Sequence, residues 1–355
     1  MSLEDDLKAR IRQTGPLTVA EYMNECLLHP LHGYYMTRDP LGASGDFTTA
    51  PEISQMFGEL LGLSLAQSWL DQGRPTPFTL AELGPGRGTL IADVMRATRG
   101  VPGFHDAARI LLLEASPTLR RTQSATLQQY EPDWINQIED LPEQPLFLIA
   151  NEFFDALPIR QFVRSGAGWC EKQIGVLEDV LAFGLGAEAL QPALEPRLAD
   201  TRDGDLVEIC DAALPYCLTV AARIAQHGGA ALIVDYGDWH SLGDTLQALR
   251  GHASAEVLSA PGTADLTAHV DFESLAHKAA AAGATFTRLT PQGIFLERLG
   301  ITDRARSLAA GLQGDALEDL IAAHRRLTHP EEMGQLFKVL GLYPDGTSPP
   351  PGLEA

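Results

Sequence analysis

The chain has 355 residues, enough for one large α/β domain with insertions or for two domains of ordinary size. Hydrophobic residues make up 45% and charged residues 21% of the sequence, which is typical of a globular protein and excludes a chain that stays unfolded. The 26 basic and 47 acidic residues give a net charge of −21 at pH 7. Because this charge would repel a phosphate backbone, we expect no nucleic-acid partner.

Cysteine usage and the amino terminus bear on the cellular compartment. The cysteines Cys26, Cys170, Cys210 and Cys217 form no CxxC pair, and the histidines lack carboxylates at a metal-binding spacing, so we expect neither a disulfide framework nor a metal. No apolar run approaches the roughly 18 residues that span a bilayer. The first residues are acidic, unlike a secretory or organelle presequence. These features predict a cytoplasmic protein without a membrane span.

Residues 1–75 are predicted to form an N-terminal helical annex that acts as a lid. Thr18 and Glu21 have the spacing of a capping box and open one amphipathic helix. Thr49 and Glu52 have the same spacing and open a second, so capping alone explains these two residues. Asp46, which precedes the second helix, is not explained by capping, and we therefore include it among the candidate catalytic residues.

Residues 76–160 and 206–355 are predicted to form a Rossmann-like α/β core. The apolar runs at 78–83, 109–114, 146–152 and 230–235 are typical of buried parallel strands, and each ends on or contains an acid. Substrate-side additions are expected around residues 240–330, and residues 285–296 are predicted to form a further strand. Residues 161–205 are predicted to be an insertion with a hairpin.

A glycine loop, Glu82-Leu83-Gly84-Pro85-Gly86-Arg87-Gly88, follows the first core strand, where α/β folds bind nucleotides. Glycines let the backbone approach a ligand and turn into a helix. The carboxylate of Glu82 would repel a pyrophosphate but suits S-adenosylmethionine (SAM), which carries a sulfonium and an ammonium. The loop therefore favours a SAM site over an NAD site or a purely structural turn.

Further acids follow the next strands. Glu114 could accept two hydrogen bonds from ribose hydroxyls, although a helix-capping role is the alternative. Asp140 and Leu141 could hold the adenine edge, and an ordinary loop is almost as good an interpretation. The candidate cofactor-binding residues are thus Glu82, Gly84, Pro85, Gly86, Gly88, Glu114, Asp140, Leu141 and Asn151.

The string 151–158, which we call the acid turn, follows the strand at 146–152 and carries Glu152 and Asp155. Two carboxylates could hold an arginine guanidinium in a charge-assisted grip and align one nitrogen with a methyl group. In the alternative interpretation, Asp155 caps the turn while Phe153 and Phe154 are core residues. His269, in a polar string before a helix, could relay a proton. The candidate catalytic residues are therefore Glu152, Asp155, His269 and Asp46.

Several long strings of the sequence resemble those of one known family. They are Gly33-Tyr34-Tyr35, the string 46–55, the glycine loop, the acid turn, Asp235-Tyr236-Gly237, the string 265–272 and the string 333–338. Together they resemble the MidA-like class I SAM-dependent methyltransferases, whose mitochondrial member is a protein arginine methyltransferase that assists complex I assembly. The string 243–247 departs from the family pattern.

The resemblance implies a class I methyltransferase sheet of seven strands with an added substrate-side region, and a donor pocket on Gly84, Gly86 and Glu114. It also implies an arginine of a partner protein as the methyl acceptor, in the manner of respiratory-complex assembly. A small-molecule methyltransferase, a non-catalytic SAM-binding assembly factor and, more distantly, an NAD-dependent oxidoreductase remain alternatives. A homodimer also stays open.

Overall fold

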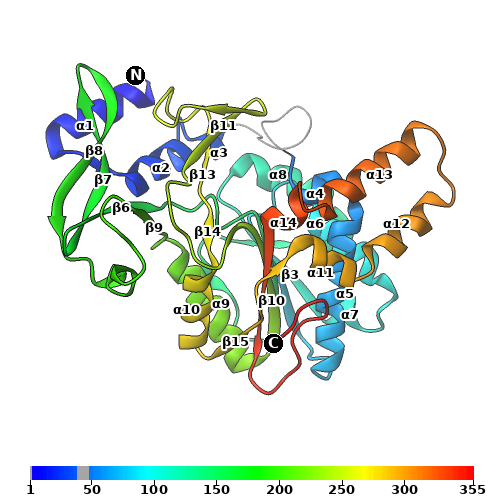
Figure 1. Cartoon of the computed structure of the whole chain (residues 1–355). Coiled ribbons are helices and arrows are strands. Elements are labelled where there is room, and N and C mark those ends of the chain that lie inside the picture. The colour runs from blue at the N-terminus through cyan, green and yellow to red at the C-terminus, as the bar shows by residue number, and fades with distance from the viewer. Residues whose placement is uncertain (1, 38–47) are drawn as a thin grey trace.

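The computed structural model describes residues 2–37 and 48–355. Within them, a nine-stranded sheet forms the centre of the molecule (Figure 1). Its main path runs through β15 (Ala284–Phe286), β17 (Phe337–Pro344), β10 (Gly229–Asp238), β5 (Leu146–Asn151), β2 (Phe78–Leu83), β3 (Ala108–Leu113) and β4 (Asp133–Ile135). The strands from β10 to β4 are parallel, and β17 runs antiparallel to both of its neighbours on the path.

This strand order explains where the site forms. Strand β2 pairs with β3 on one side and with β5 on the other. The chain that follows β2 therefore lies beside the carboxyl ends of both neighbours. Every residue of β2 and of β5 is buried, as expected for continuous apolar strands covered on both faces. Ligands of open α/β sheets bind outside these carboxyl ends. The predicted α/β fold with a Rossmann-like, largely parallel sheet is confirmed.

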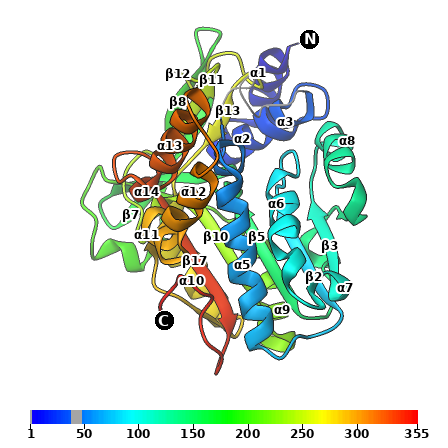
Figure 2. The same ribbon diagram turned by 90° about the vertical axis from the view of Figure 1, so that its right-hand side faces the viewer.

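Helices cover both faces of the sheet, each over its own hydrophobic cluster. One face packs against α5 (Gln55–Asp71), α6 (Thr89–Ala97) and α11 (Gln292–Arg298). The other packs against α9 (Ala213–His227) and α10 (Phe272–Ala281). Figure 2 shows the long helix α5 lying across the first of these faces. The sheet is thus the middle of three layers.

The carboxyl-terminal third differs from one sequence prediction. The strand predicted within residues 285–296 ends at Phe286, and residues Gln292–Arg298 form helix α11. A short apolar run fits a strand or a buried helix equally well, and here the run and its neighbours form a helix. Helices α12 (Ile301–Ala309), α13 (Asp315–Thr328) and α14 (Met333–Leu336) follow before β17 returns to the sheet.

A second sheet lies beside the central one. Strands β6 (Arg160–Ser165), β7 (Gly168–Leu177), β8 (Val180–Ala189) and β9 (Leu206–Ile209) form it, and β7 and β8, of ten residues each, make a hairpin. Strand β1 (Leu17–Thr18) adds to its edge by pairing with β7. Figure 1 shows helices α1 (Leu3–Thr14) and α2 (Val19–Leu28) next to this hairpin. The N-terminal helices and the hairpin therefore share one small core.

Smaller elements complete the fold. A three-stranded sheet contains β11 (Gln247–Arg250), β12 (Ala253–Ala255) and β13 (Asp265–Thr267), and short helices include α3 (Tyr34–Thr37), α4 (Ala50–Ile53), α7 (Phe104–Ala107) and α8 (Pro117–Thr126). Strands β14 (Val270–Asp271) and β16 (Thr290–Pro291) pair at the sides of β10 and β17. Among the described residues, none of the helices combines the length and apolarity that crossing a membrane requires.

Candidate functional site

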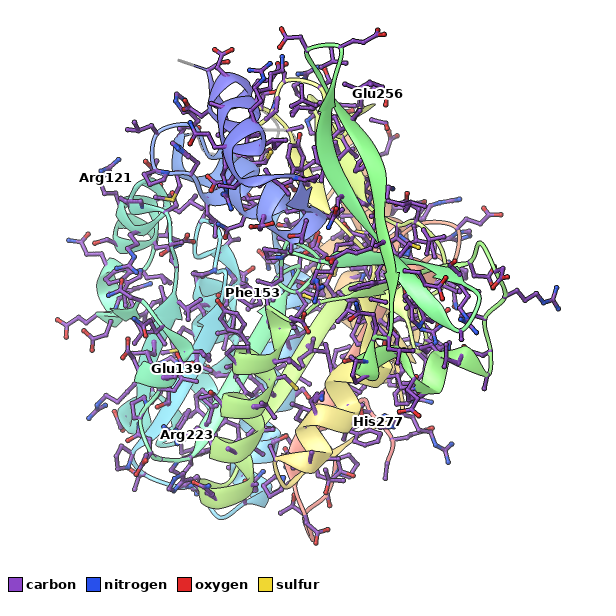
Figure 3. All side chains as sticks on the ribbon, turned by 90° about the vertical axis from the view of Figure 1, so that its left-hand side faces the viewer. Arg121, Glu139, Phe153, Arg223, Glu256 and His277 are labelled. Atoms are coloured by element: carbon purple, nitrogen blue, oxygen red, sulfur yellow. The ribbon has the colours of Figure 1, made fainter. Side chains whose placement is uncertain are left out.

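A pocket opens at the carboxyl ends of β2, β3 and β5, and its empty volume, including the part open to solvent, is about 1190 Å³. Its walls come from both halves of the molecule. The central sheet supplies the glycine loop, Glu114 and part of the acid turn, while α2, α3 and α4 supply the opposite wall. Figure 3 shows Phe153 of the acid turn near the middle of the molecule, between the N-terminal helices and α9.

The glycine loop turns sharply at the floor of the pocket. Gly84, Gly86 and Gly88 have φ values of 62°, 52° and 82°, which residues other than glycine rarely adopt. A Cβ at Gly84 would lie 3.0 Å from Cδ2 of Phe153. Gly88 then begins helix α6 in a left-handed conformation. The loop thus leaves backbone exposed to a ligand at the amino terminus of a helix, as the sequence predicted.

Glu82 lies under this loop with only 3% of its surface exposed. Burial raises its pKa to about 8, and the nearby Glu114 carboxylate adds to this effect, which the Ile91 amide opposes. Its Oε2 atom accepts no hydrogen bond from the described residues. A buried carboxyl oxygen without a partner is costly, and an ammonium or sulfonium ligand would relieve that cost. The pocket therefore fits the cationic part of SAM.

Glu114 follows β3 and is already held by the protein. Its Oε1 accepts from the Ser116 amide at 2.7 Å, and its Oε2 accepts from Nε2 of Gln123 at 3.0 Å. The same nitrogen of Gln123 donates to the Gly86 carbonyl at 2.8 Å. Each carboxylate oxygen has a second lone pair, so Glu114 could still accept the two hydroxyls of a ribose. Gln123 links this acid to the glycine loop.

Glu152 begins the acid turn and faces the pocket. Its φ is 51°, a left-handed conformation that costs a non-glycine residue about 1 kcal/mol or more. Its Oε1 accepts from the Ala50 amide at 3.2 Å and from Nδ2 of Asn151 at 3.1 Å. Burial nevertheless raises its pKa to about 7. Glu152 is thus a carboxyl group that a cationic ligand would ionise near neutral pH.

Asp155 lies behind Glu152 and is not among the residues that line the pocket. It is buried, and its Oδ1 accepts no hydrogen bond within the part of the chain that the structure describes. Burial, and next the Glu152 carboxylate, raise its pKa to about 7. Asp235 of β10 is buried beside it. The structure therefore brings both predicted acids of the turn together but turns only Glu152 toward the pocket.

The wall opposite the acid turn adds a tyrosine and another acid. Tyr35 of α3 lines the pocket, and its hydroxyl donates to Oδ1 of Asp265 at 2.7 Å. Asp265 begins β13, and its charge raises the pKa of Glu152. Glu52 of α4 also lines the pocket and accepts from the Thr89 hydroxyl at 2.7 Å. Asp265 thus acts on Glu152, and Glu52 adds a further acid to the pocket wall, 4.0 Å from Arg87.

The other predicted site residues lie in different places. Gly84, Pro85, Gly86, Glu114 and Asn151 line the pocket together with Glu82, and Gly88 begins the helix beside it. Asp140 is exposed and caps a short helix, while Leu141 is buried in the core under α9, so neither lines the pocket.

His269 is also absent from the pocket wall. Its ring packs edge-on against Tyr236, with 5.4 Å between the ring centroids, and burial lowers its pKa. Asp46 lies outside the described residues. The roles proposed for both in catalysis therefore stay predictions.

Sequence reasoning missed the pocket residues Asn24, Tyr35, Glu52 and Arg87, and it also missed Gln123, which does not line the pocket but holds Glu114. Only two signals could have found them. Tyr35 and Glu52 belong to strings that carry the family resemblance, and Arg87 lies inside the glycine loop. Asn24 and Gln123 sit on amphipathic helices whose sequences give no sign of a ligand.

Comparison with known proteins agrees with this site. The chain belongs to the family whose description is "Putative S-adenosyl-L-methionine-dependent methyltransferase", which matches residues 60–290. Both the resemblance found in the sequence and the predicted cofactor, SAM, are confirmed. The chain is thus a SAM-dependent methyltransferase of the MidA-like type.

Curated relatives match almost the whole chain. The protein arginine methyltransferase NDUFAF7 of Xenopus laevis is 38% identical, covering 97% of this chain and 84% of its own. The human protein of the same name is 36% identical, covering 95% of this chain and 82% of its own. Both are mitochondrial proteins. The prediction of a cytoplasmic protein is wrong on this evidence, because acidity at the amino terminus is a poor guide to compartment.

A solved structure shows the same fold with a ligand. The crystal structure of a COG1565 superfamily member from Burkholderia thailandensis, bound to S-adenosyl-homocysteine, superposes with a TM-score of 0.83 at 29% identity. The match covers 96% of this chain and 91% of that one. A second crystal structure from the same organism gives a TM-score of 0.78 at 30% identity, with the same coverage of both chains.

Proposed function

We propose that this enzyme transfers a methyl group from SAM to a guanidinium nitrogen of an arginine on a partner protein. The observation that carries the proposal is Glu152, a carboxyl group with a pKa of about 7 that faces the same pocket as the glycine loop. The relatives named protein arginine methyltransferase support the choice of acceptor.

The donor side of the pocket would hold SAM through Glu82, the glycine loop and Glu114. Glu82 would pair with the cationic amino acid part, and Glu114 would accept from the ribose hydroxyls. When bound, SAM supplies a methyl group on a positively charged sulfur. The glycine loop leaves its backbone open to this ligand because Gly84 has no side chain. A Cβ at this position would crowd Phe153.

Glu152 would bind the acceptor. Its carboxylate can take two N–H bonds from a guanidinium, which fixes one nitrogen in the pocket. A guanidinium keeps its proton in water because its pKa is above about 12, so attack on a methyl group requires a base that takes one proton as the new C–N bond forms. Glu152, once ionised by the cation that it binds, is that base. Asp155 and Asp265 would keep the surroundings negative.

Radiolabelled transfer tests the proposal. The enzyme is incubated with methyl-tritiated SAM and a protein extract, and the proteins are hydrolysed to separate methylarginine from other methylated residues. We expect labelled methylarginine with the wild type and with Glu256→Gln, an exposed matched control. Glu152→Gln should lower the label at least a hundredfold, about the loss seen when one group that stabilises a transition state is removed.

The other outcomes identify the alternatives. Label that appears only in the small-molecule fraction would make the chain a small-molecule methyltransferase. Binding of SAM without any label would favour the non-catalytic assembly factor. Equal label from the wild type and Glu152→Gln would remove Glu152 from the mechanism while leaving the acceptor class standing.

A further inference from the structure

We propose that Asp235 is the positioning residue of this enzyme, which fixes the acid turn from behind so that Glu152 faces the acceptor. The inference rests on the proposed function for the role of Glu152. Asp235 was noted in the sequence only as the acid that ends a core strand and as part of a family string.

The contacts of Asp235 are with the backbone of the acid turn and of its own strand. Its Oδ2 accepts from the amides of Phe154 at 3.0 Å and Asp155 at 3.2 Å. Its Oδ1 accepts from the amide of Tyr236 at 2.9 Å. One fully buried side chain thus holds three backbone donors, two of which lie two and three residues after Glu152.

The acid turn is fixed at two further points. The amide of Glu152 donates to the Val234 carbonyl at 2.9 Å, and the Asp155 carbonyl accepts from the Ala268 amide at 2.9 Å. Between them, Glu152 adopts its left-handed conformation, with φ at 51°. Such a conformation persists only where its surroundings over-determine it. The two hydrogen bonds to Asp235 lie between these two points, at the Phe154 and Asp155 amides.

The charges around Asp235 argue against a residue kept for stability alone. Burial raises its pKa, and the carboxyl groups of Asp155 and Glu152 raise it further. Tyr236, Tyr35 and Asp265 face the same group of acids. On α13, Arg326 acts on Glu152 in the opposite direction. Three crowded carboxyl groups cost folding free energy, so a gain elsewhere must offset them.

A double-mutant cycle separates positioning from general stability. The probe is N-acetyl-L-arginine amide, titrated into enzyme saturated with S-adenosyl-homocysteine. We expect Asp235→Asn to weaken binding of the probe about tenfold in the wild type, as for loss of one hydrogen bond to a charged group. In a Glu152→Gln background, Asp235→Asn should weaken binding of the probe less than about twofold, because both substitutions act through the contact between Glu152 and the probe. Affinity for S-adenosyl-homocysteine should stay within about twofold throughout.

Glu208→Gln is the matched control. Glu208 is another buried acid that accepts from backbone, taking the Thr245 amide at 3.0 Å, and among the described residues its side chain accepts hydrogen bonds from Gln161 and Thr245 and not from the acid turn. We expect this variant to lower the melting temperature without changing affinity for the probe. Equal effects of Asp235→Asn in both backgrounds, or no effect in the wild type, would overturn the inference.

Hydrogen exchange of backbone amides tests the role of Asp235 without the arginine probe. If the wild type binds S-adenosyl-homocysteine but not the arginine probe, the proposed function fails. Faster exchange at the Phe154 and Asp155 amides in Asp235→Asn, but not in Glu208→Gln, would still establish that Asp235 holds the turn. Unchanged exchange at both amides would refute it.

Discussion

The donor and acceptor sides of the pocket are built in different ways. On the donor side, one strand–loop–helix unit supplies the glycine loop, and protein donors occupy both oxygens of Glu114. On the acceptor side, groups from α3, α4, β5, β10 and β13 meet around Glu152, where several carboxyl groups lie close together. Local backbone geometry therefore forms the proposed donor side, whereas contacts between distant segments form the proposed acceptor side.

The largest effect on this comparison is expected when a side chain is added to the glycine loop. Gly84→Val places a β-branched side chain at a φ of 62° and against Phe153, so we expect affinity for S-adenosyl-homocysteine to fall at least about thirtyfold, as for 2 kcal/mol of strain. Calorimetric titration measures this. Gly175→Val is the control, because a Cβ there meets no atom within 4 Å. Undiminished affinity would show that backbone geometry does not make the donor site.

A smaller effect should follow from releasing Glu114. Gln123→Ala removes the hydrogen bonds to Oε2 of Glu114 and to the Gly86 carbonyl, and we expect about a tenfold loss of affinity for S-adenosyl-homocysteine. The exposed Gln128→Ala is the control, measured in the same titration. Should Gln123→Ala bind as tightly as the wild type, the ordering of Glu114 by the protein would be irrelevant to the donor.

The pH dependence of kcat/KM tests the role of Glu152 on the acceptor side. Glu152 must be ionised to act as a base, and its raised pKa of about 7 means that it is protonated below that pH. With SAM saturating at each pH, kcat/KM should fall about tenfold for each unit below the pKa and level off above it. The profile of Glu152→Gln should lack this acidic limb. A wild-type limb near pH 4.5, the ordinary value for glutamate, would mean that burial does not tune this group.

Much of the donor side could be predicted from sequence. The glycine loop begins at the end of the apolar run of β2, which contains Glu82, and Glu114 follows the apolar run of β3; parallel strands bring such ends together by topology alone. Asp140 shows the limit of that logic: it also follows a short strand, but it caps a helix outside the pocket. An acid near a strand end can serve either purpose, and only packing decides which.

The acceptor side could be predicted only in part. Glu152 was found because it follows a buried strand directly. Tyr35 and Asp265 are 230 residues apart, and no local pattern indicates that their side chains meet. Helix α11 was likewise misread as strand because Ile294, Phe295 and Leu296 are consecutive apolar residues, which suit either structure.

The position of β17 has a consequence for synthesis of the chain. This strand, Phe337–Pro344, lies between β10 and β15, although every other strand of the sheet precedes it in sequence. Until it leaves the ribosome, β10 has no partner on that side, and the strand that carries Asp235 remains an open edge. Unpaired edges invite association with other chains. An unpaired β10 would therefore favour association between incomplete chains, and we expect truncation before Phe337 to yield an insoluble product, which sedimentation of the expressed variant measures.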